Sequence, residues 1–150
     1  MSQRMNYNSA APAGMKALGA AYGYIRTSEL PSRLVDLVYL RVSQINGCAY
    51  CIDMHSRDLL NAGMRIEHLV LVPVWSEACG AFTEQEKAGL AWAEAVTRVS
   101  EGGVPDVAYQ NAAAVFGNKQ LADLTIAIGL MNAYNRIATS FRATPAALAA

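Results

Sequence analysis

Apolar side chains recur along this sequence at intervals of three and four residues, and strict alternation never persists. The first such series is Met15, Leu18, Ala21, Tyr22 and Ile25. A denser series follows at Leu34, Val35, Leu37, Val38, Leu40, Val42 and Ile45. This spacing places apolar groups on one face of an α-helix, whereas a half-buried strand would alternate with a period of two. The pattern predicts helices and no strand.

Proline, glycine and capping residues mark where these helices begin and end. Pro31 suits a first helical turn, and Gly47 suits the position just after a helix. Thr83 and Glu86 have the spacing of a capping box at a helix start. The expected helices cover about residues 15–25, 31–45, 48–61, 66–72, 83–100, 105–116 and 119–141.

The sequence therefore predicts a single all-α domain of six or seven helices over residues 1–150. Residues 1–11 are expected to form a loose N-terminal arm and residues 145–150 a frayed tail. With 53% hydrophobic and only 16% charged residues, the chain is more apolar than a monomer of this size needs. An alanine-rich helical protein would have this composition, but burial of apolar surface between subunits accounts for it better.

Charge and targeting features exclude several classes of partner. Basic and acidic residues number 12 each, so no footprint for nucleic acid or an anionic membrane is expected. The longest purely apolar run, residues 69–75, is far shorter than the ~20 residues that span a bilayer, and no apolar signal region is visible near the N-terminus. Three cysteines argue against a secreted disulfide framework. A cytoplasmic protein is expected.

The candidate chemistry lies in Cys48-Ala-Tyr-Cys51 and in His55 four residues later. On a helix, Cys48 and Cys51 are an i,i+3 pair and Cys51 and His55 an i,i+4 pair, so all three share one face. Two cysteines one turn apart have the Cα separation that a disulfide needs, about 4.4–6.8 Å. A neighbouring imidazole can accept a thiol proton or stabilise a thiolate. The motif predicts a redox centre with its own base.

The spacing of these three residues is compatible with more than one kind of site. A thioredoxin-type CxxC would follow a strand, but here a helix precedes it. A zinc site needs further ligands, and His68 and Cys79 are single, widely spaced residues that we interpret as an ordinary histidine and an inert thiol. Purely structural thiols are a third possibility. A thiol peroxidase or dithiol reductase on a helical scaffold is favoured, with no metal and no cofactor.

Residues 40–55, LRVSQINGCAYCIDMH, strongly resemble the alkylhydroperoxidase D-like branch (AhpD-like) of the carboxymuconolactone decarboxylase superfamily. The resemblance continues through FTEQEKAGLAWAEA at residues 82–95 and NAYNR at residues 132–136. It implies an all-helical fold, a homo-trimer or hexamer, and reduction of alkyl hydroperoxides through a dithiol/disulfide cycle. A dithiol reductant, protein-bound or of lipoyl type, would restore the thiols.

The resemblance also implies roles for individual residues. Cys51 stands where the peroxidatic cysteine stands, Cys48 where the resolving cysteine stands, and His55 where the proton-relaying histidine stands. Asp36 replaces the glutamate that the family has twelve residues before the first cysteine, so its reach is shorter. Tyr50 occupies the position of a second histidine. Both departures concern the proton relay and leave the dithiol intact.

The charge of the pair is under two opposing influences. The N-terminus of a helix that begins at Cys48 favours a thiolate there by about 0.3–1 kcal/mol, whereas His55 favours a thiolate at Cys51. A desolvated imidazolium–thiolate pair can exceed the dipole term, so Cys51 is predicted to be the reactive thiolate.

Further candidates surround this motif. Asp36, Tyr39 and Ser43 lie three, four and seven residues apart, on one helix face that can line the cysteine pocket. Tyr50 can line the pocket or a subunit interface, and Arg136 can form a structural ion pair or lie near the pocket. The leading hypothesis is a peroxidase of antioxidant defence. Lactone chemistry of the carboxymuconolactone decarboxylase type, whose branch lacks the cysteine pair, and a non-catalytic dithiol sensor are the alternatives.

Overall fold

The computed structural model describes residues 2–78 and 80–148, so Cys79 lies outside the described residues. The α-helices are α1 (Tyr7–Ala10), α2 (Pro12–Arg26), α3 (Ser32–Ile45), α4 (Ala49–Asn61), α5 (Ile66–Leu69), α6 (Glu84–Thr97), α7 (Asp106–Ala113) and α8 (Asn118–Phe141). Short 3₁₀ helices are η1 (Val72–Glu77), η2 (Val99–Glu101) and η3 (Ala146–Leu148). This part of the chain contains no strand, and the prediction of an all-α fold is confirmed.

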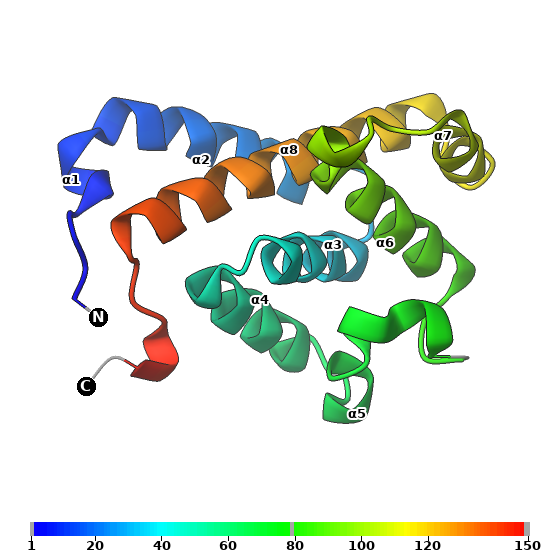
Figure 1. Cartoon of the computed structure of the whole chain (residues 1–150), viewed down its shortest axis with the longest axis horizontal. Helices are drawn as coiled ribbons and strands as arrows, with labels where there is room; N and C mark the ends of the chain where they lie inside the picture. The colour runs from blue at the N-terminus through cyan, green and yellow to red at the C-terminus, as the bar shows by residue number, and fades with distance from the viewer. Residues whose placement is uncertain (1, 79, 149–150) are drawn as a thin grey trace.

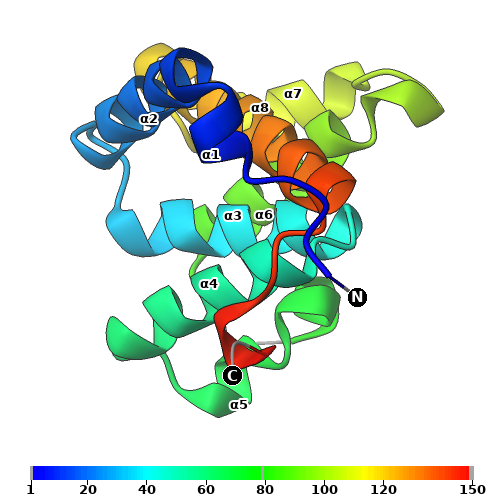
Figure 2. The same ribbon diagram turned by 90° about the vertical axis from the view of Figure 1, so that its left-hand side faces the viewer.

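Helix α3 is the centre of the fold. It packs against α4, α6 and α8, and in Figures 1 and 2 it lies between the layer formed by α2 and α8 and the layer formed by α4 and α5. Val38 and Val42 contribute to the core cluster shared with α8, whereas Leu37 and Leu40 contribute to a second cluster beneath α4 and α6. A helix with apolar residues on both faces is buried on both faces. The functional candidates on α3 are therefore held rigidly.

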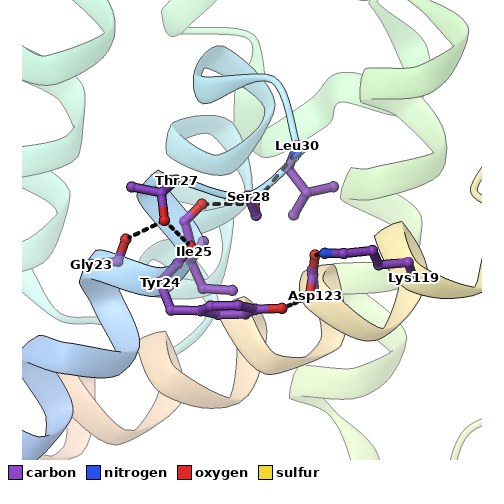
Figure 3. Close-up of polar contacts among 8 residues, drawn as sticks. All are labelled: Gly23, Tyr24, Ile25, Thr27, Ser28, Leu30, Lys119 and Asp123. Atoms are coloured by element: carbon purple, nitrogen blue, oxygen red, sulfur yellow. Dashed lines mark hydrogen bonds and ion pairs between the residues drawn. The ribbon is translucent and has the colours of Figure 1, made fainter.

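The turn between α2 and α3 is fixed by local side-chain hydrogen bonds, which Figure 3 shows. Thr27 Oγ1 donates to the Tyr24 carbonyl at 3.0 Å, and Ser28 Oγ donates to the Ile25 carbonyl at 2.7 Å. Tyr24 also reaches α8, where its hydroxyl donates to Asp123 at 2.7 Å and Lys119 donates to the same carboxylate at 2.7 Å. The hydrogen bond between Tyr24 and Asp123 thus fixes the last turn of α2, which carries Arg26, against α8.

The N-terminal segment that was expected to be loose has defined contacts with α8. Asn6 caps the single turn of α1 by accepting the backbone N–H of Asn8 and Ser9. The backbone N–H of Arg4 donates to the Phe141 carbonyl at 3.0 Å. This places α1 and the start of α2 beside the end of α8 (Figure 2).

The C-terminal segment also has a defined position as far as residue 148. Helix η3 follows α8, and the backbone N–H of Ala147 donates to Asp53 on α4 at 3.2 Å. Both ends of the described chain thus approach the N-terminal part of α4, where the cysteines lie (Figure 2). None of the described helices combines the length and the hydrophobicity that crossing a bilayer requires.

Candidate active site

The turn between α3 and α4 places Cys48 at a helix N-terminus. Gly47 has a left-handed backbone with φ of 65°, a conformation that glycine adopts without a Cβ clash. Cys48 then has extended dihedrals, φ −87° and ψ 94°, and its Sγ accepts the backbone N–H of Cys51 at 3.4 Å. A sulfur thus occupies the N-cap position that serine or aspartate usually takes.

The two sulfurs meet as the spacing predicted. Cys48 Sγ and Cys51 Sγ lie 2.7 Å apart, and both residues are buried. A disulfide bond length is about 2.05 Å, so its formation requires only a small movement of the side chains. The described geometry is that of a dithiol ready to oxidise internally.

The pKa values of the two cysteines shift in opposite directions. The hydrogen bond from Cys51 lowers the pKa of Cys48 to about 6 against the opposing effect of burial, and the Cys51 N–H, Thr139 and Asn135 lower it further. The same hydrogen bond to Cys48 raises the pKa of Cys51, and burial adds to that rise. The resting negative charge therefore lies on Cys48, with the remaining proton on Cys51. The hydrogen bond from the Cys51 thiol is the largest cause of this asymmetry, and the Cys51 backbone N–H at the start of α4 adds to it.

Ser43 and Asn135 are polar residues that form hydrogen bonds with the cysteine side chains. Asn135 on α8 is buried, and its amide donates to Ser43 Oγ at 3.0 Å and accepts a hydrogen bond from Asn46 at 2.9 Å. Hydrogen bonds from Asn135 lower the pKa of both cysteines, and one from Ser43 lowers the pKa of Cys51. Ser43 was expected at this site, but Asn135 was missed. Its signals were its place in the NAYNR segment and its polarity on a helix that is otherwise largely apolar.

His55 is fully buried and electrically neutral. Its ring packs against Tyr39 with centroids 5.1 Å apart, and burial lowers its pKa to about 4. The His55 Nδ1 lies 3.5 Å from an Asp58 oxygen, which is too long for a good hydrogen bond. Within the described residues neither ring nitrogen has a hydrogen-bond partner. A neutral, unpartnered imidazole is free to accept a proton.

Two carboxylates lie next to this histidine. Asp36 is buried and accepts a hydrogen bond from Arg26 at 2.8 Å, and burial raises its pKa although Arg26 opposes the rise. Candidate ligand atoms of Asp36, His55 and Asp58 all lie within 4.8 Å of one another. A cation there would have to compete with Arg26, so the set fits a carboxylate–imidazole proton relay better than a metal centre. Asp58 was not among the residues predicted for the site, although its i,i+3 spacing from His55 could have identified it.

The remaining sequence candidates separate into two groups. Tyr39 is buried, and no described residue forms a hydrogen bond with its hydroxyl, whereas Tyr50 is half-buried beside the cysteines. Arg136 is exposed and donates to the Asn132 carbonyl and side chain at 2.9 Å. His68 lines a different hollow, near α5 and the start of α6. Neither Arg136 nor His68 is brought to the dithiol among the described residues.

Each cysteine opens onto its own cavity. Cys51 faces a cavity of about 400 Å³, whose lining is formed by Tyr7, Asn8, Met15, Tyr22, Tyr50, Met54, Met131, Tyr134 and Ala138. Cys48 faces a second cavity of about 500 Å³, bounded by the end of α8 and the segment that follows it. Tyr50 and Ala138 line both cavities and form the wall between them. The dithiol is therefore reachable from two directions.

Comparison with known proteins identifies the family. The sequence model of the carboxymuconolactone decarboxylase family matches residues 12–95, which include both cysteines and His55. The chain belongs to this family. YdfG of Bacillus subtilis, one of its relatives, is 36% identical over 137 residues, which make up 91% of this chain and 92% of YdfG.

Solved structures place the chain in the AhpD-like branch of the carboxymuconolactone decarboxylase family. ATU0492 of Agrobacterium tumefaciens, described as a candidate antioxidant defence protein AhpD, is 40% identical with a TM-score of 0.92, over 96% of this chain and 98% of that one. A peroxidase-related protein of Ralstonia eutropha with an AhpD core shares the fold at 18% identity and a TM-score of 0.79, over 92% of this chain and 73% of its own. The resemblance inferred from residues 40–55 is confirmed.

Proposed function

We propose that this AhpD-like protein is a thiol-dependent peroxidase that reduces organic hydroperoxides through a Cys48/Cys51 dithiol cycle. The observation that carries the proposal is the buried dithiol itself, with sulfurs 2.7 Å apart at the floor of an apolar cavity. Antioxidant defence, the role in the description of the Agrobacterium relative, is compatible with this chemistry.

The first step oxidises Cys51, the cysteine that faces the apolar cavity. Its S–H proton passes to the neutral imidazole of His55, and the thiolate attacks the outer oxygen of the hydroperoxide. The O–O bond breaks, and Cys51 becomes a sulfenic acid. The alkoxide takes the proton from His55 and leaves as the alcohol. Burial keeps His55 unprotonated beforehand, so its imidazole is in the form that can accept the Cys51 proton.

The second step closes the disulfide. The Cys48 thiolate attacks the Cys51 sulfur, the S–O bond breaks, and the departing hydroxide is protonated to water. Hydrogen bonds from the Cys51 backbone N–H, Thr139 and Asn135 lower the pKa of Cys48 and favour the thiolate that this attack requires. Two thiols of a reductant then reduce the disulfide and are themselves oxidised to a disulfide.

The cavity at Cys51 indicates the substrate class. Tyrosine and methionine side chains dominate its described lining, and no charged side chain contributes to it. Its volume of about 400 Å³ lies within the range of about 300–1,000 Å³ typical of small-molecule sites. This surface favours a hydroperoxide with an uncharged alkyl or aryl group over hydrogen peroxide.

A turnover assay tests the proposed function. Purified protein with dithiothreitol should consume cumene hydroperoxide catalytically, and consume it faster than hydrogen peroxide. Cys48→Ser and Cys51→Ser should each abolish turnover. A single stoichiometric oxidation without turnover would instead support a dithiol sensor, and turnover that survives both substitutions would exclude the cycle.

We also infer a homo-oligomer, a trimer or hexamer. Val107 and Tyr109 on α7 and Ile126 on α8 are exposed apolar side chains on neighbouring helices. Burial of such a surface between subunits would match the apolar composition. Light scattering should give the mass of three or six chains, and Ile126→Glu should shift it toward smaller species; a monomer at micromolar concentration would contradict this.

A further inference from the structure

The cavity beside Cys48 carries a second inference, which rests on the proposed function. We propose that it is the site of the reductant, a thiol that carries an anionic group, and that Arg142 binds that group. Hydroperoxide and reductant would then reach the same disulfide centre from opposite sides of a wall formed by Tyr50 and Ala138.

The lining of this cavity differs in charge from that of the first cavity. The residues around Cys48 are Gly47, Ala49, Tyr50, Ala138, Thr139, Arg142, Ala143, Thr144, Pro145 and Leu148. Arg142 is the single charged side chain among them, whereas the described lining at Cys51 has none. A small apolar hollow with one cation at its rim suits a short aliphatic thiol with a carboxylate or phosphate.

The backbone at Arg142 gives the cation a second distinguishing feature. Arg142 ends α8 with φ 54° and ψ 53°, and within the described residues it is the only non-glycine residue with positive φ. Glycine usually occupies this position after a helix because a Cβ is crowded there. No carboxylate of residues 2–78 or 80–148 lies within ion-pair distance of its guanidinium. A strained position thus holds a cation that no carboxylate of the described residues pairs with, at the opening next to Cys48.

A thiol that enters the cavity beside Cys48 meets the Cys48 sulfur, because Cys48 and not Cys51 lines that cavity. The reductant thiolate attacks Cys48 Sγ, the Cys48–Cys51 bond breaks, and Cys51 leaves as a thiolate that takes up a proton. A second reductant thiol then attacks the reductant sulfur of the mixed disulfide, and Cys48 leaves as a thiolate. Two reductant thiols become one disulfide, and the electrons end on the two cysteines. Cys48 is a good leaving group in this last step because leaving thiols of low pKa depart faster.

A charge series of thiols tests the role of Arg142. The protein is first oxidised with diamide, so that the test does not depend on reaction with a hydroperoxide. Rates of disulfide reduction are then measured with mercaptoacetate, 2-mercaptoethanol and cysteamine. Arg142→Gly should slow reduction by mercaptoacetate about twofold to fivefold, the effect of one partly exposed ion pair, and leave the rate with mercaptoethanol unchanged. Arg142→Lys should retain most of the preference, and salt should weaken it.

Arg136→Ala is the matched control, because Arg136 is an exposed cation on the same helix that lines neither cavity. Its three rates should equal those of the unmodified protein. An Arg142→Gly protein that slows all three thiols equally, or none of them, would overturn the inference.

A steric pair of variants tests the separation of the two routes. Thr144 lines only the cavity at Cys48, and Met54 lines only the cavity at Cys51. Thr144→Trp should slow reduction of the diamide-oxidised protein and leave oxidation by cumene hydroperoxide unchanged. Met54→Trp should slow oxidation by cumene hydroperoxide and leave reduction unchanged. If Met54→Trp slows reduction while Thr144→Trp does not, the reductant uses the cavity at Cys51. If no hydroperoxide oxidises the dithiol, the proposed function fails, and the reduction measurements still decide the role of Arg142.

Discussion

The sulfur of Cys48 caps the helix that carries Cys51, accepting the Cys51 backbone N–H at 3.4 Å while the Cys51 side chain lies 2.7 Å away. The Cys48 sulfur therefore accepts hydrogen bonds from both the backbone N–H at the helix N-terminus and the Cys51 thiol. Both interactions favour negative charge on Cys48. Cys51, which supplies the thiol hydrogen bond, keeps its proton.

This arrangement predicts an unusual pH profile for alkylation. Reaction of Cys48 with iodoacetamide should rise as pH increases through about 6, where its pKa lies, and level off above it. An ordinary cysteine would rise near about 8.5. Cys51→Ala should move the midpoint upward because it removes the largest cause of the lowered pKa, and Cys51→Ser should move it less because its hydroxyl can still donate. Mass spectrometric mapping that finds Cys51 alkylated first would contradict the assignment.

The proposed order of oxidation predicts which species can be trapped. Mild peroxide should convert Cys48 and Cys51 into a disulfide and leave Cys79 reduced. In Cys48→Ser the reactive thiol lacks its partner, so a sulfenic acid should accumulate at Cys51 and react with dimedone. If the single-cysteine protein that retains Cys48 reacts faster with peroxide than the one that retains Cys51, the two roles must be exchanged.

Much of this fold could be predicted from local sequence signals. The capping box at Thr83 and Glu86 forms as expected, and the helix over residues 31–45 is observed as α3, Ser32–Ile45. The helix expected over residues 66–72 instead ends at Leu69 and gives way to the 3₁₀ turns of η1 around Pro73, which cannot donate a backbone hydrogen bond. Element type followed from periodicity, whereas this boundary was set by Pro73.

The site was less predictable because part of it depends on distant residues. Cys48 and Cys51 lie on one short segment, so their spacing was enough to bring the two sulfurs together, whereas His55 contacts Tyr39 and lies near Asp36 and Asp58. Asn135 joins the two cysteines across 92 positions from Ser43, and no local pattern indicates that contact. Local spacing also could not show how deeply His55 is buried, and this burial lowers its pKa to about 4 and removes its positive charge.

Asn135 should therefore tune the thiol pKa from α8. Asn135→Ala removes a hydrogen bond that lowers the pKa of both cysteines, so the alkylation midpoint of Cys48 should shift to higher pH. Asn132→Ala is the matched control, since Asn132 also contacts Asn46 but is not among the main groups that shift either cysteine pKa. Equal shifts in the two variants would indicate a general loosening of α8 instead.

Arg142 gives a stability prediction that is independent of any reaction. Arg142→Gly relieves the crowding of a left-handed residue but adds flexibility to the unfolded chain, so the free energy of unfolding should stay equal or rise by up to about 1 kcal/mol. Chemical denaturation measures the difference, with Arg142→Ala, which keeps a Cβ, for comparison. A loss of more than about 1 kcal/mol on mutation to glycine would mean that the arginine side chain holds a structural contact.

The proton relay gives the sharpest test of the candidate site. If Asp36 and Asp58 favour proton uptake by His55, their removal should slow thiol oxidation while the fold survives. Asp58→Asn should lower the His55 pKa further, because Asp58 is what raises it against burial. A less basic imidazole takes the Cys51 proton less readily, so oxidation should slow by about tenfold or more, at the low end of general-base contributions.

Asp36→Asn should also slow oxidation at least about tenfold, as expected for a residue that supports a catalytic group. Asp36→Glu should retain activity, because it keeps the charge opposite Arg26 and extends the reach. His55→Ala should slow oxidation at least as much as Asp36→Asn or Asp58→Asn.

Asp53→Asn is the control for these variants. Asp53 is a carboxylate of α4, the helix that carries His55, but it pairs with Arg57. Stopped-flow oxidation across neutral pH distinguishes these cases. Unchanged rates in both Asp36→Asn and Asp58→Asn would mean that the Cys51 proton leaves by way of Cys48, whose sulfur is already within 2.7 Å.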